Sequence, residues 1–222
     1  MSPTGKRPAP LTSTSYAILG LLSLRPWTTY ELAKQMDRAM GQFWPRAESK
    51  LYEEPKKLVA HGLAKATKEA VGARPRTVYS ITPKGRRAMA AWMRTPAAGP
   101  VLEFEALLKV FFAEHGTKAD LLAAIESIRA WVDERYRRAE GIPDGYLAGE
   151  GPFPERLPWL LLTGQLLQEW VDAVDRWSAW AQATVESWPE DLRDAPPDLE
   201  VLAEQVRKAA QHRATTAAAR TT

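Results

Sequence analysis

The sequence predicts a mainly α-helical protein with a small β-hairpin, divided into two domains. Apolar residues recur at three- and four-residue steps through most of the chain, whereas residues 77–82 alternate apolar and polar side chains after a basic turn. A Pro- and Gly-containing break at residues 95–100 separates two parts of opposite charge. Residues 1–96 contain 17 Lys and Arg against 6 Asp and Glu, a net charge of +11, and residues 97–222 contain 13 against 21, a net charge of −8. This asymmetry predicts a polyanion-binding half joined to a half with a different task.

Three helices are expected after a flexible arm at residues 1–11. Apolar spacing places them at residues 12–25, 28–41 and 46–61, and serine or threonine at the start of the first two can cap their free backbone N–H groups. A glycine directly after the third helix is typical of a helix C-terminus. Pro55 lies inside the third helix, where it removes one backbone hydrogen bond and is expected to kink the helix or alter the turn.

The third helix combines an apolar face with a polar face. Leu51, Leu58 and Val59 are spaced to point inward. The side chains expected to point mostly outward are Arg46, Lys50, Glu53, Glu54 and Lys57.

A hairpin and a fourth helix complete the first domain. Residues 63–71 and 77–82 fit two strands around a tip at residues 72–76, and a proline-started helix follows at residues 84–94. Three helices followed by two strands is the order of a winged helix-turn-helix domain, here predicted for residues 12–95. In that fold the third helix enters the major groove of DNA and the hairpin lies over the flanking backbone.

The second domain is predicted to be all α-helical and to extend over residues 101–213, after a linker at residues 96–100. A Gly- and Pro-rich segment at residues 141–158 is expected to be an irregular loop, and residues 214–222 a disordered tail. The expected helices span residues 102–114, 118–138, 159–188 and 199–212.

Composition argues against several classes of protein. There is no cysteine, and His61, His115 and His212 are far apart in sequence without acidic partners at ligand spacing, so no metal or other cofactor is expected. The sequence has no Gly-rich phosphate loop and no Gly-x-Ser-x-Gly motif, so no enzyme is expected. It also has no apolar run long enough to cross a membrane and no apolar segment of a signal peptide, which predicts a cytoplasmic protein.

Several short motifs in residues 11–95 resemble the PadR family of bacterial transcription regulators. They are Ser15-Tyr16-Ala17-Ile18-Leu19-Gly20-Leu21-Leu22, Thr29-Tyr30-Glu31-Leu32, Leu51-Tyr52 ahead of Leu58 and Gly62-Leu63, and Arg74-Pro75-Arg76 running into Tyr79-Ser80-Ile81-Thr82-Pro83-Lys84-Gly85. The helical second half is similar in pattern to the C-terminal domain of longer members that resemble virulence activators. One departure is Pro55, which stands where members usually have a leucine.

The resemblance implies a homodimer that binds double-stranded DNA at a palindromic operator. It further implies a repressor that a small-molecule effector releases, with the C-terminal helices forming the dimer. An alternative from another class is a protein-interaction adaptor that uses the winged domain as a scaffold and does not bind DNA. The charge of the first half argues against the adaptor.

The candidate DNA-binding residues come from the hairpin and from two helices. At the hairpin tip, Arg74 and Arg76 are candidates for phosphate contacts, although solvated turn arginines are the alternative. On the third helix, Lys50 can reach a phosphate group or a guanine edge. The alternative is that Lys50 only aids solubility and that Tyr52 packs in the core. Tyr30 can either contact phosphate or pack in the core. The full set is Tyr30, Arg46, Ser49, Lys50, Tyr52, Lys56, Lys57, Arg74, Arg76 and Thr77.

Tryptophans are concentrated in the long C-terminal helix. Trp159, Trp170, Trp177 and Trp180 lie in or at the start of this helix. Aromatic residues at helical spacing are typical of a core or a dimer interface, where they bury a large area. Flat aromatic side chains at a dimer seam could also enclose a small aromatic effector, and the two interpretations are compatible.

Overall fold

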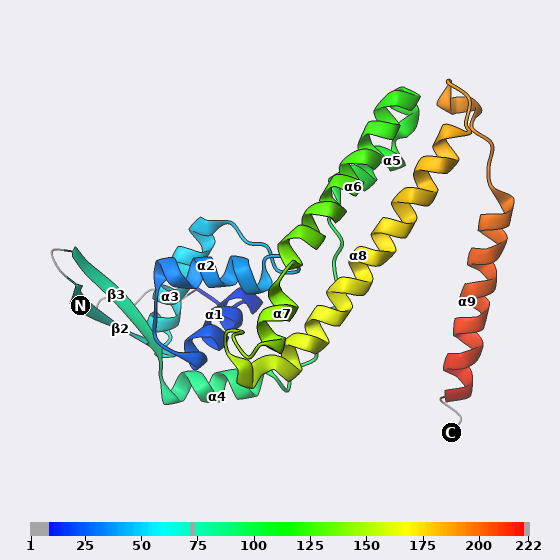
Figure 1. Cartoon of the computed structure of the whole chain (residues 1–222). Helices are drawn as coiled ribbons and strands as arrows, with labels where there is room; N and C mark the ends of the chain where they lie inside the picture. The colour runs from blue at the N-terminus through cyan, green and yellow to red at the C-terminus, as the bar shows by residue number, and fades with distance from the viewer. Residues whose placement is uncertain (1–8, 72–73, 220–222) are drawn as a thin grey trace, which may run out of the picture. The chain divides into compact units, whose positions relative to one another are not determined.

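The structure, a computed structural model, describes residues 9–71 and 74–219, with the backbone alone at residues 70, 71, 74 and 75. The chain divides into two compact units, Met1–Val101 and Leu102–Thr222. Both units are mostly helical, and the first also contains a small antiparallel sheet (Figure 1). The predicted fold class is therefore confirmed. In the described ranges, no helix is both long and apolar enough to cross a membrane.

Helix α1 (Ser13–Leu24) is the most deeply buried helix of the first unit. It begins with a reciprocal cap, because the Thr12 hydroxyl accepts from the Ser15 N–H and the Ser15 hydroxyl accepts from the Thr12 N–H. Four of its apolar side chains are almost completely removed from solvent: Ile18, Leu19, Leu21 and Leu22. Tyr16 and Leu24 are half-buried.

Helix α2 (Thr29–Met40) also begins with a capping box, formed by Thr28 and Glu31. Helix α3 (Glu48–Ala60) begins two residues later than predicted, so that Arg46 precedes the helix. Both helices pack against α1 and against each other.

Pro55 lies within α3, which continues through it to Ala60. The ring is fully buried, one turn after Leu51 and about one turn before Leu58. The proline thus occupies an inward position, where it contributes apolar surface to the core at the cost of one helical hydrogen bond.

Strands β2 (Ala64–Val71) and β3 (Arg74–Ile81) form the predicted hairpin, with β3 starting three residues earlier than expected. A two-residue strand, β1 (Trp27–Thr28), pairs with the other edge of β3 and gives the sheet order β1-β3-β2. Two residues are too few for a period-2 pattern, so β1 was not predicted. Trp27 holds it in place, because the buried indole N–H donates to the Leu21 carbonyl oxygen at 2.8 Å.

Helix α4 (Pro83–Trp92) follows the hairpin directly, and the Thr82 hydroxyl caps it by accepting from the Gly85 N–H at 3.0 Å. A Cβ at Gly85 would lie 2.2 Å from the Leu63 carbonyl oxygen and 2.9 Å from Ile81 Cγ1. The glycine therefore lets the first turn of α4 approach the base of the hairpin.

The second unit is centred on two long antiparallel helices, α6 (Lys118–Ala139) and α8 (Leu157–Glu186), which lie side by side in Figure 1. Helix α5 (Glu105–Phe111) packs against α6. The core lies between α6 and α8 and consists of Leu121, Ile125, Ile128 and Val132 from α6 with Val171, Val174, Ala181 and Val185 from α8.

Two predictions about irregular segments were wrong. The segment 141–158 contains a short helix, α7 (Ile142–Leu147), which a proline in its first turn helps to start. The C-terminal helix α9 (Leu199–Ala219) continues through most of the tail that was expected to be disordered, because alanine favours helix. The rest of that tail, 220–222, and residues 1–8 of the expected arm lie outside the described residues.

Candidate nucleic-acid interface

One face of α3 is anchored in the core and the other is open to solvent. The buried residues are Leu51, Glu54, Pro55 and Leu58, which are three, one and three residues apart and so share one side of the helix. The exposed side chains that were predicted to bind DNA are Ser49, Lys50, Tyr52 and Lys56. The solvent-exposed face thus presents a hydroxyl, a phenol and two ammonium groups, together with the carboxylate of Glu53.

The N-terminal turn of α3 also exposes backbone donors and one acidic side chain. Ala47 precedes the helix and offers no side-chain cap. The Lys50 N–H donates to the Ala47 carbonyl oxygen at 3.0 Å, which leaves the N–H groups of Glu48 and Ser49 at the open end of the helix. Glu48 lies in this turn and accepts a hydrogen bond from the Tyr52 hydroxyl, which raises the pKa of Tyr52. Glu48 was not among the predicted site residues.

Tyr30 lies at the start of α2 and is 63% exposed. It is close enough to Tyr52 for the charge of a Tyr30 phenolate to raise the pKa of Tyr52. Tyr52 itself is 36% exposed. The alternative in which either tyrosine packs in the core is therefore wrong.

Arg46 and Lys57 are less available than the sequence suggested. The Arg46 guanidinium lies over the Trp44 ring at 4.2 Å and donates to the Pro45 carbonyl oxygen at 2.6 Å and to the Thr14 hydroxyl. Lys57 was expected to point outward, but its Nζ lies 2.8 Å from Glu54 Oε1 and its side chain is only 16% exposed. Glu54 was also expected outward, and its side chain is 11% exposed. The corrections for Glu54 and Lys57 follow from the inward face of α3 extending further round the helix than its leucines indicate. Arg46 precedes the helix and remains exposed.

The hairpin presents cations on both of its strands. Arg76 is exposed and pairs with Glu69 directly across the strands, with Arg76 Nη2 3.1 Å from Glu69 Oε2. Thr77 is half-buried opposite Lys68. The side chain of Arg74 lies outside the described part of the chain. Lys65 and Lys68 on β2 are exposed and were missed, although their place in a predicted strand beside a basic turn could have indicated them.

The tryptophans of α8 have two different environments. Trp177 packs against both parts of the core between α6 and α8. Trp159, Trp170 and Trp180 are 61%, 40% and 45% exposed.

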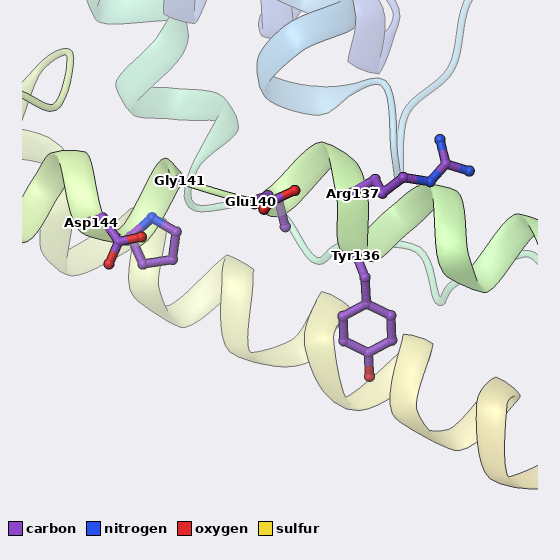
Figure 2. A pocket seen from close by; sticks show the side chains of 7 residues that line it. Tyr136, Arg137, Glu140, Gly141 and Asp144 are labelled. Carbon is purple, nitrogen blue, oxygen red and sulfur yellow. The ribbon is translucent and has the colours of Figure 1, made fainter.

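An open hollow of about 480 Å³ lies at the junction of α6 and α7, and no tryptophan lines it. Figure 2 shows Tyr136 and Glu140 at this hollow, and the Tyr136 hydroxyl donates to Asp172 on α8 at 2.6 Å.

Residues 18–91 match the model of the transcriptional regulator PadR-like family. This segment is a PadR-like domain. The negative transcriptional regulator PadR of Bacillus subtilis is 29% identical over 99 residues, which are 44% of this chain and 54% of that protein. The matched region thus covers about half the length of the curated relatives. The resemblance predicted from the motifs is confirmed for the PadR-like domain.

Solved structures share the fold of this chain beyond the PadR-like domain. Bacillus subtilis PadR in complex with operator DNA has a TM-score of 0.60 at 19% identity, covering 79% of this chain and 98% of that chain. The same protein in complex with p-coumaric acid has a TM-score of 0.53 at 20% identity, covering 80% and 96%. The virulence activator AphA of Vibrio cholerae has a TM-score of 0.52 at 23% identity, covering 78% and 98%. At these identities the likeness shows the fold alone.

The PadR-like domain contains all the predicted DNA-binding residues. Its structure brings four of them together on α3 and places Tyr30 beside them, whereas Lys57 is used inside the domain. The hairpin contributes Arg76 with the two additional lysines of β2.

Proposed function

We propose that this chain is a transcriptional regulator that binds duplex DNA as a homodimer through its PadR-like domain. The observation that carries this proposal is the exposed face of α3, which combines Ser49, Lys50, Tyr52 and Lys56 beside a cationic hairpin. Exposed cations supply affinity for phosphate, and a helix of this diameter fits the major groove. DNA binding needs no catalytic group, and a regulator that binds DNA in this way acts in the cytoplasm.

The two DNA-binding elements have different tasks in this proposal. Helix α3 lies in the major groove, where Lys50 binds guanine O6 and N7 while Ser49 donates to a phosphate oxygen. Tyr52 donates to phosphate once its hydroxyl turns away from Glu48. The hairpin follows the DNA backbone, with Arg74, Arg76 and Thr77 along β3 and the lysines Lys65 and Lys68 along β2. Lys56 and Tyr30 contribute further phosphate contacts.

The second unit supplies the dimer interface. Along the first half of α8, apolar side chains recur at steps of three and four residues and remain exposed: Trp159, Leu162, Leu166 and Trp170. Contiguous exposed apolar residues of this size mark an interaction surface. A second copy covering this stripe would hold two PadR-like domains together, and a symmetric dimer binds a palindromic operator with half-sites one or more helical turns apart.

Repression and its release by a small aromatic molecule complete the proposal. The support is the similarity in fold to Bacillus subtilis PadR, which has been solved both with operator DNA and with p-coumaric acid. The exposed Trp159, Trp170 and Trp180 would line the dimer seam, where a planar molecule could stack on them.

The test is binding of the purified chain to the DNA upstream of its own gene, followed by fluorescence anisotropy over a series of salt concentrations. We expect nanomolar-range affinity that falls steeply with salt, and a random duplex of equal length should compete poorly. If random DNA competes as well as the upstream region, the proposed sequence-specific function is wrong. A protein-interaction adaptor would bind neither duplex.

A further inference from the structure

A buried polar contact joins the first turn of α1 to the middle of α3. Ser15 is fully buried, and its hydroxyl donates to Glu54 Oε2 at 2.6 Å. The other carboxylate oxygen, Glu54 Oε1, accepts from Lys57 Nζ at 2.8 Å. The Glu54 carboxylate is therefore held from α1 on one side and from α3 itself on the other.

The same turn of α1 also holds the segment that leads into α3. The Thr14 hydroxyl accepts from the indole N–H of Trp44 at 3.2 Å and from Arg46 Nε at 3.4 Å. One short stretch of α1 thus contacts both the entry to α3 and its central turn. Together these contacts define the position of α3 along its axis and its rotation about that axis.

Stability alone does not explain a charged pair at this place. Burying a carboxylate and an ammonium group costs about as much as their attraction returns, and apolar residues of similar size are often equally good or better. Hydrogen bonds, in contrast, are directional, whereas the contacts of Leu51, Pro55 and Leu58 are not. A directional contact is needed where the orientation of a surface matters.

We propose that Glu54, held by Ser15 and Lys57, is a positioning residue that sets the rotation of α3 and thereby the sequence discrimination of the DNA-binding face. Successive residues of a helix are about 100° apart, so a small rotation moves Lys50 and Tyr52 relative to base edges. Phosphate contacts from flexible lysines tolerate such a shift, but bidentate base contacts do not. This inference rests on the proposed function.

The test compares two variants with the wild type for binding to operator and to random duplexes at one salt concentration. Ser15→Ala removes the contact with α1 and keeps the ion pair, but it also removes the capping bond from the Thr12 N–H. Glu54→Met/Lys57→Met leaves that cap in place and replaces the ion pair with apolar side chains of similar size. We expect the ratio of operator to random affinity to fall by about tenfold in each, the order of discrimination that one base contact carries. Affinity for random DNA should stay unchanged, and the double variant should keep its melting temperature.

Ser23→Ala is the matched control. It removes a hydroxyl from the same helix whose 2.6 Å hydrogen bond, to the Gly20 carbonyl oxygen, does not reach α3. The control should keep the wild-type affinity ratio. If the double variant does not fold, Ser15→Ala carries the test by itself.

Two outcomes would overturn the inference while the proposed function stands. One is a folded variant that keeps the wild-type ratio, and the other is an equal loss of affinity for both duplexes, which would indicate a merely structural role. A wild-type protein that does not prefer its operator would instead refute the proposed function, and the inference would fall with it.

Discussion

Neighbouring residues of the same type have different tasks in the PadR-like domain. Lys56 is exposed on α3, whereas Lys57, the next residue, is paired with the buried Glu54. The difference arises because consecutive helical residues point about 100° apart and the inward face of α3 ends between them. The number of positive charges counted from the sequence therefore overstates the number that can contact DNA.

At the hairpin, substitutions of Arg76 and Glu69 measure separately how one positive and one negative charge affect DNA affinity. We expect Arg76→Ala to weaken binding to all duplexes and to reduce the slope of log affinity against log salt by about one, because one phosphate contact is lost. Glu69→Gln should have the opposite effect on affinity, since it removes a nearby negative charge and releases Arg76 from its partner. Anisotropy titrations measure both.

The stability of the two variants provides the control. An exposed ion pair contributes at most about 1 kcal/mol to folding, so both variants should unfold close to the wild type. An Arg76→Ala protein with unchanged affinity would show that the hairpin does not touch the DNA backbone.

Glu31 makes stability depend on pH at the start of α2. Hydrogen bonds from Thr28, first from its backbone N–H and then from its hydroxyl, lower the pKa of Glu31, and Arg25 and Arg76 lower it further. A carboxylate with a lowered pKa stabilises the folded state at neutral pH, and this stabilisation is lost as pH falls below the ordinary glutamate pKa of about 4.3 and through the lowered one.

The variant Glu31→Gln should therefore have a lower melting temperature than the wild type near pH 7. The difference should shrink as the wild-type carboxylate becomes protonated, because both side chains are then neutral. Thermal unfolding followed by circular dichroism from neutral to acidic pH measures this convergence. A difference that is constant across the range would mean that the charge of Glu31 is not what stabilises the cap.

At the scale of elements, the hairpin is connected to the helices at few, tightly packed points. Thr82 caps α4 and its hydroxyl also donates to the Gly62 carbonyl oxygen at 2.8 Å. Lys84 Nζ donates to the His61 carbonyl oxygen at 2.8 Å and so satisfies an acceptor at the end of α3. The Thr-Pro-Lys-Gly motif thus links the end of α3, the base of the hairpin and the start of α4.

Gly85→Ala tests this junction. The added methyl group has no space beside the Leu63 carbonyl oxygen, so α4 must shift away from the hairpin, and we expect a loss of about 2 kcal/mol in the free energy of unfolding. Urea denaturation measures the loss. Gly164→Ala is the control, because nothing lies within 4 Å of a Cβ at that position on α8. Equal stability of the two variants would contradict the close approach.

At the scale of the whole molecule, the two units differ in how much apolar surface they leave uncovered. The long helix α8 packs against α6 along its second half, while its first half exposes Trp159, Leu162 and Leu166. Helix α9 has no buried residue along its described length. Such surfaces are typical of a protein completed by a second copy.

Leu166→Glu should disrupt the proposed dimer. A carboxylate at the centre of an apolar interface is costly to bury, so the chain should become monomeric at micromolar concentration and operator affinity should fall, since a monomer holds a single half-site. Analytical ultracentrifugation measures the mass of the protein, and fluorescence anisotropy measures its affinity for the operator. Ala183→Glu, an exposed position on the other half of α8, should remain dimeric. A Leu166→Glu protein that is still a dimer would place the interface elsewhere.

Local patterns accounted for the helices and for the hairpin. The capping residues Thr12 and Thr28 start α1 and α2, and the apolar spacing from Leu121 to Ile128 predicts α6. Motif order also led to the PadR-like family from the sequence. The two-residue β1 and the short α7 were missed, because segments of that length carry no period.

The sequence by itself determined the order of elements, the split in charge and the family of the first domain, since each depends on residues near one another in the chain. Only the tertiary structure decided which polar side chains are available to DNA. Glu54 lies on the inward side of α3, where Ser15, thirty-nine residues earlier in the chain, donates a hydrogen bond to it and Lys57 pairs with it. A contact at that separation leaves no periodic pattern in the sequence, and it exists only once α1 and α3 have packed together.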